Sequence, residues 1–315
     1  TGGYSSGAYW DEDYGGWMAF WFWTDEGNQN AGVGYSSSNT TCFAGTYDGS
    51  NVRAYGNGTQ AGINARTGAL RSPGTSSLTL GKAWGGSDFG SIWTDGYMDE
   101  VRISSVARSS NWLWACYQTM ASNTVFNGYG PATARVFTPQ QMKLSFAGYT
   151  NRTETLTNFP VLVVLSNNVN GSGYNYSNFV SSSGYDLRFV ASPSDTTSYN
   201  YEIEKWDPSG ASYVWVQVPA IPGDGSGCMW VKWGNSTNRS QLPCTTNGAT
   251  WDSNYKGVWH LGNGTTLSLA DATANGNNGT INGGVSASSL QVDGCALFDG
   301  STGYITVNNS SSLNE

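Results

Sequence analysis

Charged side chains are scarce in this sequence: Asp, Glu, Lys and Arg make up only 11% of the residues. An average soluble domain carries about 25%. The scarcer sign is positive, with 14 basic against 22 acidic residues and a net charge of −8. We therefore expect no nucleic-acid partner, because phosphate binding needs clustered Lys and Arg. Abundant neutral polar residues favour an extracellular surface instead.

Long apolar runs are also missing. No stretch approaches 18 apolar residues, so we expect no membrane insertion. The chain begins at Thr1 without a basic-then-apolar leader, which we interpret as a mature secreted product or an excised repeat. The expected location is secreted, on an extracellular surface.

Histidine is nearly absent, and a Ser-His-Asp triad would have to use His260, the only one. A lone histidine is more often structural than catalytic. Glu202, Glu204 and Asp207 offer paired carboxyls of the kind that glycosidases use. Lys205 lies beside them as a countercharge, which favours a paired or solvated face. We therefore expect no catalytic residues and no enzyme activity.

The five cysteines form no CxxC pair, which argues against zinc and thioredoxin-like sites. Cys228 and Cys244 are close enough in sequence to close a hairpin-sized loop by a disulfide in an oxidising compartment. Cys42, Cys116 and Cys295 remain, an odd number. They leave a free thiol, an intermolecular bridge or simply buried side chains as alternatives.

Strand patterns dominate what is present. Short runs rich in Val, Ile, Tyr, Trp and Phe alternate with turn residues, and the clearest runs are 17–23, 78–80, 161–165, 213–218, 229–233 and 304–307. Asp48-Gly49, Asn57-Gly58 and Asp95-Gly96 predict hairpin turns. One helix is expected, within 106–121. The predicted fold class is all-β: an antiparallel jelly roll plus a second β-sandwich domain.

The run at 17–23 (WMAFWFW) is apolar on both faces. Trp17, Trp21 and Trp23 fall on one face, and Phe20 and Phe22 on the other. Both faces should therefore be covered. The cover is either another part of the chain or a neighbouring subunit, and these five residues are our candidate subunit interface.

Two sets of motifs resemble a laminin-G-like, concanavalin A-type jelly roll. The segments 45–58 (GTYDGSNVRAYGNG) and 97–103 (YMDEVRI), with Ala107-Arg108 and Trp112, resemble the second half of that domain. The segments 257–262 (GVWHLG), 271–283 and 296–307 (ALFDGSTGYITV) resemble its first half. The resemblance implies a split domain, with its C-terminal part at 1–133 and its N-terminal part at 249–315.

The middle of the chain, 134–248, resembles the domain of unknown function 2341, a β-sandwich. The motifs that carry this resemblance are FPVLVVL at 159–165, YDLRF at 185–189, YEIEKW at 201–206, ASYVWVQV at 211–218 and MWVKWG at 229–234. A Gly/Pro/Ala-rich stretch at 127–139 and the stretch TTNGAT at 245–250 mark the expected boundaries.

A split jelly roll exposes strand edges and an apolar face, so something must complete it. The two parts fold together within one chain, pair between successive chains, or belong to a tandem array. Pairing between chains is head-to-tail and builds open filaments when it does not close. Our first hypothesis is a structural protomer or repeat unit of an extracellular filament or surface layer, whose partners are other copies of itself.

The resemblance also implies ligands. Jelly rolls of this type often hold a structural Ca²⁺, and Asp271, Asn275, Asn277 and Asp99 supply suitable oxygens. The alternative is that the loop residues among them only form turns.

Carbohydrate binding, as a glycan-binding or adhesive module of a larger surface protein, is the alternative function. Its candidate residues are Trp10 and Tyr14, although aromatic residues of β-sandwiches are more often core. Asn-X-Ser/Thr sequons, for example at Asn39 and Asn175, would fit a glycoprotein.

Overall fold

A computed structural model describes residues 7–11, 17–24, 27–34, 42–70, 77–84, 91–135, 138–237, 240–263, 265–289 and 292–314. The chain divides into two compact units. Unit 1 comprises 1–114, 253–271 and 275–315, and unit 2 comprises 115–252 and 272–274. Every strand pairing in these described ranges is antiparallel, which confirms the all-β prediction.

Unit 1 has N-terminal strands, most of which pair with a neighbour in the sequence. They are β1 Gly7–Asp11, β2 Trp17–Thr24, β3 Gly27–Gly34, β4 Phe43–Tyr47, β5 Asn51–Gly56, β6 Thr59–Ala65, β7 Leu78–Leu80, β8 Lys82–Trp84, β9 Ser91–Trp93, β10 Asp95–Met98 and β11 Val101–Ser104. The sheets β1-β2-β3 and β4-β5-β6 lie against each other, because β3 contacts both β5 and β6.

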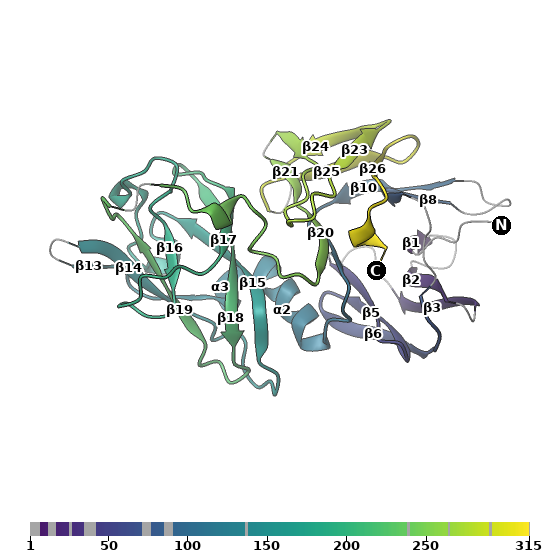
Figure 1. Cartoon of the computed structure of the whole chain (residues 1–315), viewed down its shortest axis with the longest axis horizontal. Helices are drawn as coiled ribbons and strands as arrows, with labels where there is room; N and C mark the ends of the chain where they lie inside the picture. Colours follow the sequence, from purple (N-terminus) through teal and green to yellow (C-terminus); the bar gives the residue numbers. More distant parts are fainter. Residues whose placement is uncertain are drawn as a thin grey trace. The chain divides into compact units, whose positions relative to one another are not determined.

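The C-terminal strands of unit 1 follow the middle of the chain. They are β20 Tyr255–Trp259, β21 Leu261–Asn263, β22 Thr266–Ser268, β23 Gly279–Asn282, β24 Val285–Ser288, β25 Cys295–Asp299 and β26 Tyr304–Val307, with a final 3-10 turn η4 Ser311–Leu313. In Figure 1 the yellow-green strands β24, β25 and β26 lie beside the blue strand β10.

Unit 2 contains two sheets and short helices. The elements are α2 Ser110–Ala121, which begins in unit 1, α3 Asn123–Phe126, β12 Gly128–Tyr129, β13 Thr133–Arg135, β14 Thr138–Ser145, β15 Leu156–Ser166, η1 Val169–Gly171, η2 Tyr176–Asn178, β16 Arg188–Val190, β17 Tyr201–Lys205, β18 Ala211–Ile221, β19 Cys228–Trp233 and η3 Pro243–Thr245. One sheet has the order β12-β14-β19-β16, with β13 beside β14, and the other has the order β15-β18-β17.

The core of unit 2 follows from the alternation of its strands. In β19 every second residue is buried, namely Met229, Val231 and Trp233. The longer strands β15 and β18 are buried over most of their length. Strand side chains alternate between the two faces of a sheet, so β19 presents one apolar face, whereas the middle of β15 is covered on both faces.

The outer edge of β15 is closed by side chains. The buried hydroxyl of Thr119 accepts the Leu162 N–H (3.1 Å) and donates to the Leu162 carbonyl (3.3 Å). The Asn123 and Asn127 amides also donate to that carbonyl, and the Tyr129 hydroxyl accepts the Val164 N–H. An unpaired strand edge is a template for association, and these helical and loop residues remove it.

All six strand runs predicted from the sequence fall within strands of the structure. Asp48-Gly49 and Asn57-Gly58 form the hairpin turns β4–β5 and β5–β6, and Asn57 and Gly58 have φ values of 49° and 72°. Asp95-Gly96 does not form a hairpin turn. These residues begin β10, because Asp95 pairs with Asp299 from the other end of the chain.

The helix and the first boundary also differ from expectation. The helix begins at Ser110 rather than 106, and the units part at 114/115 instead of 133/134. Residues 115–133 belong to unit 2 because the end of α2, α3 and β12 pack and hydrogen-bond there. The second boundary lies at 252/253 instead of 248/249. Among the described residues, no helix has the length and apolar character needed to cross a membrane.

Candidate assembly interface

Strands from the two ends of the chain pair with each other inside unit 1. β10 pairs with β25, β11 with β20, and β7 with β26. We call this set of contacts between 77–114 and 253–314 the joint. Each of these N-terminal strands therefore has its hydrogen-bonding partner at the far end of the sequence.

The hydrophobic core of the joint is supplied unequally. Its fully buried members from the C-terminal side are Trp259, Leu261, Ala296, Phe298, Ile305 and Val307, whereas the N-terminal side contributes Leu80. Partly buried Met98, Val101 and Ile103 pack against them. Gly81, with φ of 83°, lies directly against the Phe298 ring, where a Cβ would collide. Neither side encloses this core alone.

A buried ion-pair network crosses the joint. His260 Nδ1 lies 2.7 Å from Glu100 Oε1, and the Arg102 guanidinium donates to Glu100 Oε2 at 2.7 Å. The Glu100 side chain is 6% exposed, so the pairing takes place away from water. Glu100 has φ of 53°, in the left-handed region that disfavours non-glycine residues. The network thus holds a residue in a strained conformation.

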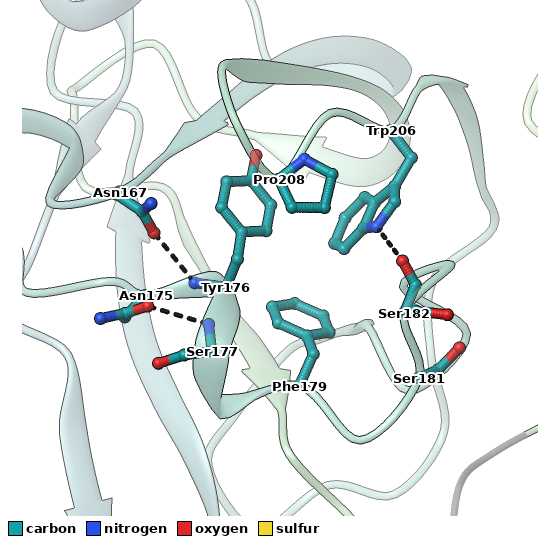
Figure 2. A pocket seen from close by; sticks show the side chains of 9 residues that line it. All are labelled: Asn167, Asn175, Tyr176, Ser177, Phe179, Ser181, Ser182, Trp206 and Pro208. Atoms are coloured by element: carbon teal, nitrogen blue, oxygen red, sulfur yellow. Dashed lines mark hydrogen bonds between the residues drawn. The ribbon is translucent and has the colours of Figure 1, made fainter.

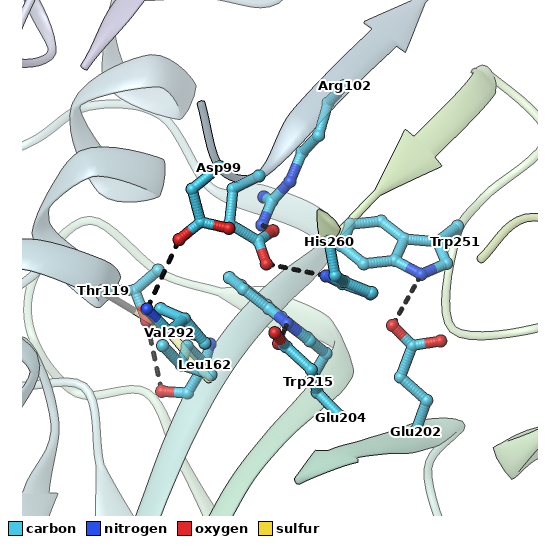
Figure 3. Close-up of polar contacts among 11 residues, drawn as sticks. Asp99, Arg102, Thr119, Leu162, Glu202, Glu204, Trp215, Trp251, His260 and Val292 are labelled. Carbon is cyan, nitrogen blue, oxygen red and sulfur yellow. Dashed lines mark hydrogen bonds and ion pairs between the residues drawn. The ribbon is translucent and has the colours of Figure 1, made fainter. Parts of the chain in front are cut away.

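Burial and neighbouring charges shift two carboxyl groups here. Burial raises the pKa of Glu100, but His260 and Arg102 outweigh burial and hold that pKa below its ordinary value. Burial, and then the charge of Glu100, raise the pKa of Asp99 to about 8. Asp99 Oδ2 accepts the Val292 N–H at 3.4 Å, while Oδ1 is buried without a hydrogen-bond partner. Figure 3 shows Asp99, Arg102 and His260 close together.

A cation–π contact of Lys82 with two aromatic rings also stabilises the joint. Lys82 Nζ lies 4.4 Å from the centre of the Trp93 ring and 4.7 Å from that of Tyr304. Each such contact contributes about 0.5–1 kcal/mol at an exposed site. Ser105 donates its N–H to the Asn254 carbonyl at 2.8 Å and extends the contact along β11 and β20.

The predicted calcium ligands are only partly together. Asp271 accepts the N–H groups of Val258 and Asn277, and the Asn277 and Asn275 amides donate to carbonyls of β20. The three loop residues therefore fasten the loop to β20. Asp99 is hydrogen-bonded to Val292 instead. A calcium site formed by Asp271, Asn275, Asn277 and Asp99 stays a prediction.

A different pair has metal-ligating character. Glu100 and His260 carry ligand types suited to a divalent metal, and their ligating atoms lie close enough to share one ion. Sequence reasoning treated His260 as structural and did not single out Glu100. The motifs GVWHLG and YMDEVRI could have indicated that Glu100 and His260 meet, because the split-domain hypothesis brings the segments that contain these motifs together.

Other predicted residues lie in parts that the structure describes less fully. Tyr14 lies outside the described residues. Trp10 belongs to β1, and Trp17, Phe20, Trp21, Phe22 and Trp23 to β2, where only the backbone is described. The glycan-binding and subunit-interface roles of these residues stay predictions.

Cys228 and Cys244 are free thiols in the structure, so the expected disulfide is not formed. The pairing stays a prediction for an oxidised form.

The acidic residues of β17 accept hydrogen bonds from tryptophan indoles. Glu202 accepts the Trp251 indole N–H at 3.0 Å, and Glu204 accepts that of Trp215 at 2.7 Å (Figure 3). Asp207 accepts the Ser209 hydroxyl and N–H, which lowers its pKa. These contacts fix side chains and loops of unit 2.

Comparison with protein families agrees with both resemblances. Residues 1–113 match the family Laminin_G_3, described as the Concanavalin A-like lectin/glucanases superfamily, and residues 183–250 match the Domain of unknown function (DUF2341). The chain thus combines a concanavalin A-like region with a DUF2341 region. No curated protein and no solved structure matches it significantly. Such matches establish fold, and function must be argued from sites.

Proposed function

We propose that this chain is a non-enzymatic structural protomer of an extracellular filament or surface layer. In the assembly, the C-terminal segment 253–314 of one chain completes unit 1 of the next. The observation that carries the proposal is the joint, in which β7, β10 and β11 all take their partners from that segment.

The joint has the properties of an exchangeable contact. Its strand pairs, core and ion pairs join two segments separated by the whole of unit 2. The same contacts are available whether the segment comes from the same chain or from a neighbour, which is the basis of domain swapping. Exchange passed from chain to chain is a heterologous contact and grows a filament.

Composition supports the same function. A surface rich in neutral polar groups and poor in charge, with net charge −8, suits an assembled extracellular coat. The concanavalin A-like and DUF2341 regions supply two rigid β units per protomer.

The test is a cysteine pair across the joint. Thr79 and Thr306 face each other in β7 and β26, within the geometry that a disulfide bridges. In the assembled protein, oxidised Thr79→Cys/Thr306→Cys should give a ladder of covalent multimers on non-reducing gels. The matched control is Thr280→Cys/Thr306→Cys, which joins β23 to β26 inside the C-terminal segment and should give only intrachain links.

Electron microscopy of the unmodified protein should show fibres under the conditions that give the ladder. Intrachain links alone from the Thr79–Thr306 pair, with single particles at every concentration, would overturn the proposal.

A further inference from the structure

Unit 2 contains a cavity of about 400 Å³ that none of the roles above uses. Its lining residues are Asn167, Asn175, Tyr176, Ser177, Phe179, Ser181, Ser182, Trp206 and Pro208. Figure 2 shows the rings of Tyr176, Phe179, Trp206 and Pro208 arranged around a common opening. Its size falls within the range of small-molecule sites, about 300–1,000 Å³.

The aromatic wall of this cavity is held in place before any ligand arrives. The Trp206 indole N–H donates to the Ser182 carbonyl at 2.8 Å. Gly184, with φ of 72°, lies so close to that ring that a Cβ would collide with it. The Tyr176 hydroxyl donates to the Leu165 carbonyl at 2.6 Å. Fixed rings lose little conformational freedom on binding, which favours affinity.

The loop that carries the other wall is anchored by a buried carboxylate. Asp186 is 1% exposed and accepts the N–H groups of Val180, Ser181 and Gly234 at 2.8–3.0 Å. Phe179 and Ser181 therefore have defined positions. The Phe179 and Trp206 rings meet edge-on, with centroids 5.0 Å apart.

The polar part of the lining is uncharged. Besides the Tyr176 hydroxyl, it consists of two amides and three serine hydroxyls, and no Lys, Arg, Asp or Glu is among the nine residues. The Oδ1 atoms of Asn167 and Asn175 accept the N–H groups of Tyr176 and Ser177. Each amide therefore keeps its NH₂ group as a donor for a ligand.

We propose that this cavity binds a neutral pyranose unit of a glycan. A pyranose has an apolar C–H face for the aromatic wall and hydroxyl edges for amides and serines. Anionic ligands would need a cation that the lining lacks. A purely apolar ligand would cover polar side chains of the lining without offering them a hydrogen bond. The proposal rests on unit 2 alone, so it stands or falls separately from filament assembly.

The experiment is calorimetric titration of the full-length chain with neutral oligosaccharides. The probes are cellohexaose, laminarihexaose, maltohexaose and mannohexaose, with an oligogalacturonate as the anionic comparator. Asn175 begins a sequon, so mass spectrometry first establishes that it is unmodified. At least one neutral probe should bind, and more tightly than the oligogalacturonate.

Two variants locate the binding. Trp206→Ala should weaken it about tenfold or more by removing the stacking ring. Ser177→Trp removes no buried contact and should block binding by filling the exposed rim. Tyr97→Ala, which removes a 58% exposed ring from unit 1, is the matched control and should bind as the wild type does.

Three results would overturn the proposal. They are no binding of any neutral probe, tighter binding of the oligogalacturonate, and neutral binding that Ser177→Trp leaves unchanged. Thermal unfolding of each variant separates lost binding from lost structure.

Discussion

In unit 2 the outer edge of β15 is closed by Thr119, Asn123 and Asn127, side chains of the same unit. In unit 1 the edges of β7, β10 and β11 are closed by strands from the other end of the chain. Both solutions satisfy strand edges, which are otherwise sites of association. An edge that is covered by side chains of its own unit needs no second molecule. An edge that is covered by a strand from the other end of the sequence can take that strand from the same chain or from another copy. If the proposed assembly takes place, this difference places it in unit 1, because unit 2 closes the edge of β15 with its own side chains.

The largest expected effect comes from the core of the joint. Phe298→Ala removes a fully buried ring and should lower the stability of unit 1 by about 3–5 kcal/mol. Hydrogen exchange with mass spectrometry should show lost protection in β10, β25 and β26, with unit 2 unchanged. Phe189→Ala, a fully buried ring of unit 2, should produce the opposite pattern. A loss shared equally by both units in either variant would contradict their independence.

A second prediction concerns pH. The pKa of Asp99 is raised to about 8 in the folded protein, against about 3.9 in an unfolded chain. A raised carboxyl pKa means that the folded state binds the proton more tightly. The contribution of Asp99 to the stability of unit 1 should therefore be fully present below about pH 4, and it should be lost as the pH rises to about 8.

Asp99→Asn should remove this dependence and stabilise unit 1 by a few kcal/mol near neutral pH. Urea unfolding at several pH values measures it. Asp95→Asn, at an exposed position of the preceding strand β10, serves as control. Parallel pH profiles for wild type and Asp99→Asn would show that Asp99 does not titrate abnormally.

The ion-pair network provides a third prediction. Glu100→Gln removes the carboxylate that pairs with His260 and Arg102 in a buried position and should cost about 3 kcal/mol. The pKa of Glu100 is lowered in the folded state, so its contribution is present above the unfolded pKa and is lost as pH falls through the folded value. Stability of the variant and the wild type should accordingly converge in acid. A constant difference across pH would count against the ion pair.

The smallest expected effect tests the closed edge of unit 2. Thr119→Val keeps the shape but leaves the Leu162 N–H without its acceptor, at a cost of about 1–3 kcal/mol. Thr157→Val, at an exposed position of β15, the strand that contains Leu162, should be near neutral. Light scattering should show self-association through unit 2 only in Thr119→Val. Equal stability of the two variants would mean that the edge needs no cover.

The sequence predicted local features of this fold better than its distant contacts. Hairpin turns such as Asn57-Gly58 were predictable because their φ values follow from two adjacent residues. Asp95-Gly96 has the same local chemistry but is a strand, because Asp299 pairs with it. Local propensity cannot identify such a partner.

The sites follow the same rule. The motif EIEKWD drew attention to Glu202 and Glu204, which hold tryptophans in the structure. Its Trp206 lines the cavity, together with residues from a loop about 30 positions earlier. Glu100 and His260 come together only because β11 pairs with β20. The split-domain resemblance indicated which segments would meet, but not which side chains would be buried between them.

The joint also has a consequence for how a newly made chain folds. Asp95 is synthesised long before Asp299, its partner in the sheet. Contacts so distant in sequence form slowly, and unit 2 can complete itself in the meantime. During that interval the edges of β10 and its neighbouring strands are unpaired. The C-terminal segment of another chain can then compete with the chain's own segment for these edges. In the assembly that we propose, the timing of synthesis, as well as the strength of the contacts, would decide whether a chain closes on itself or joins its neighbour.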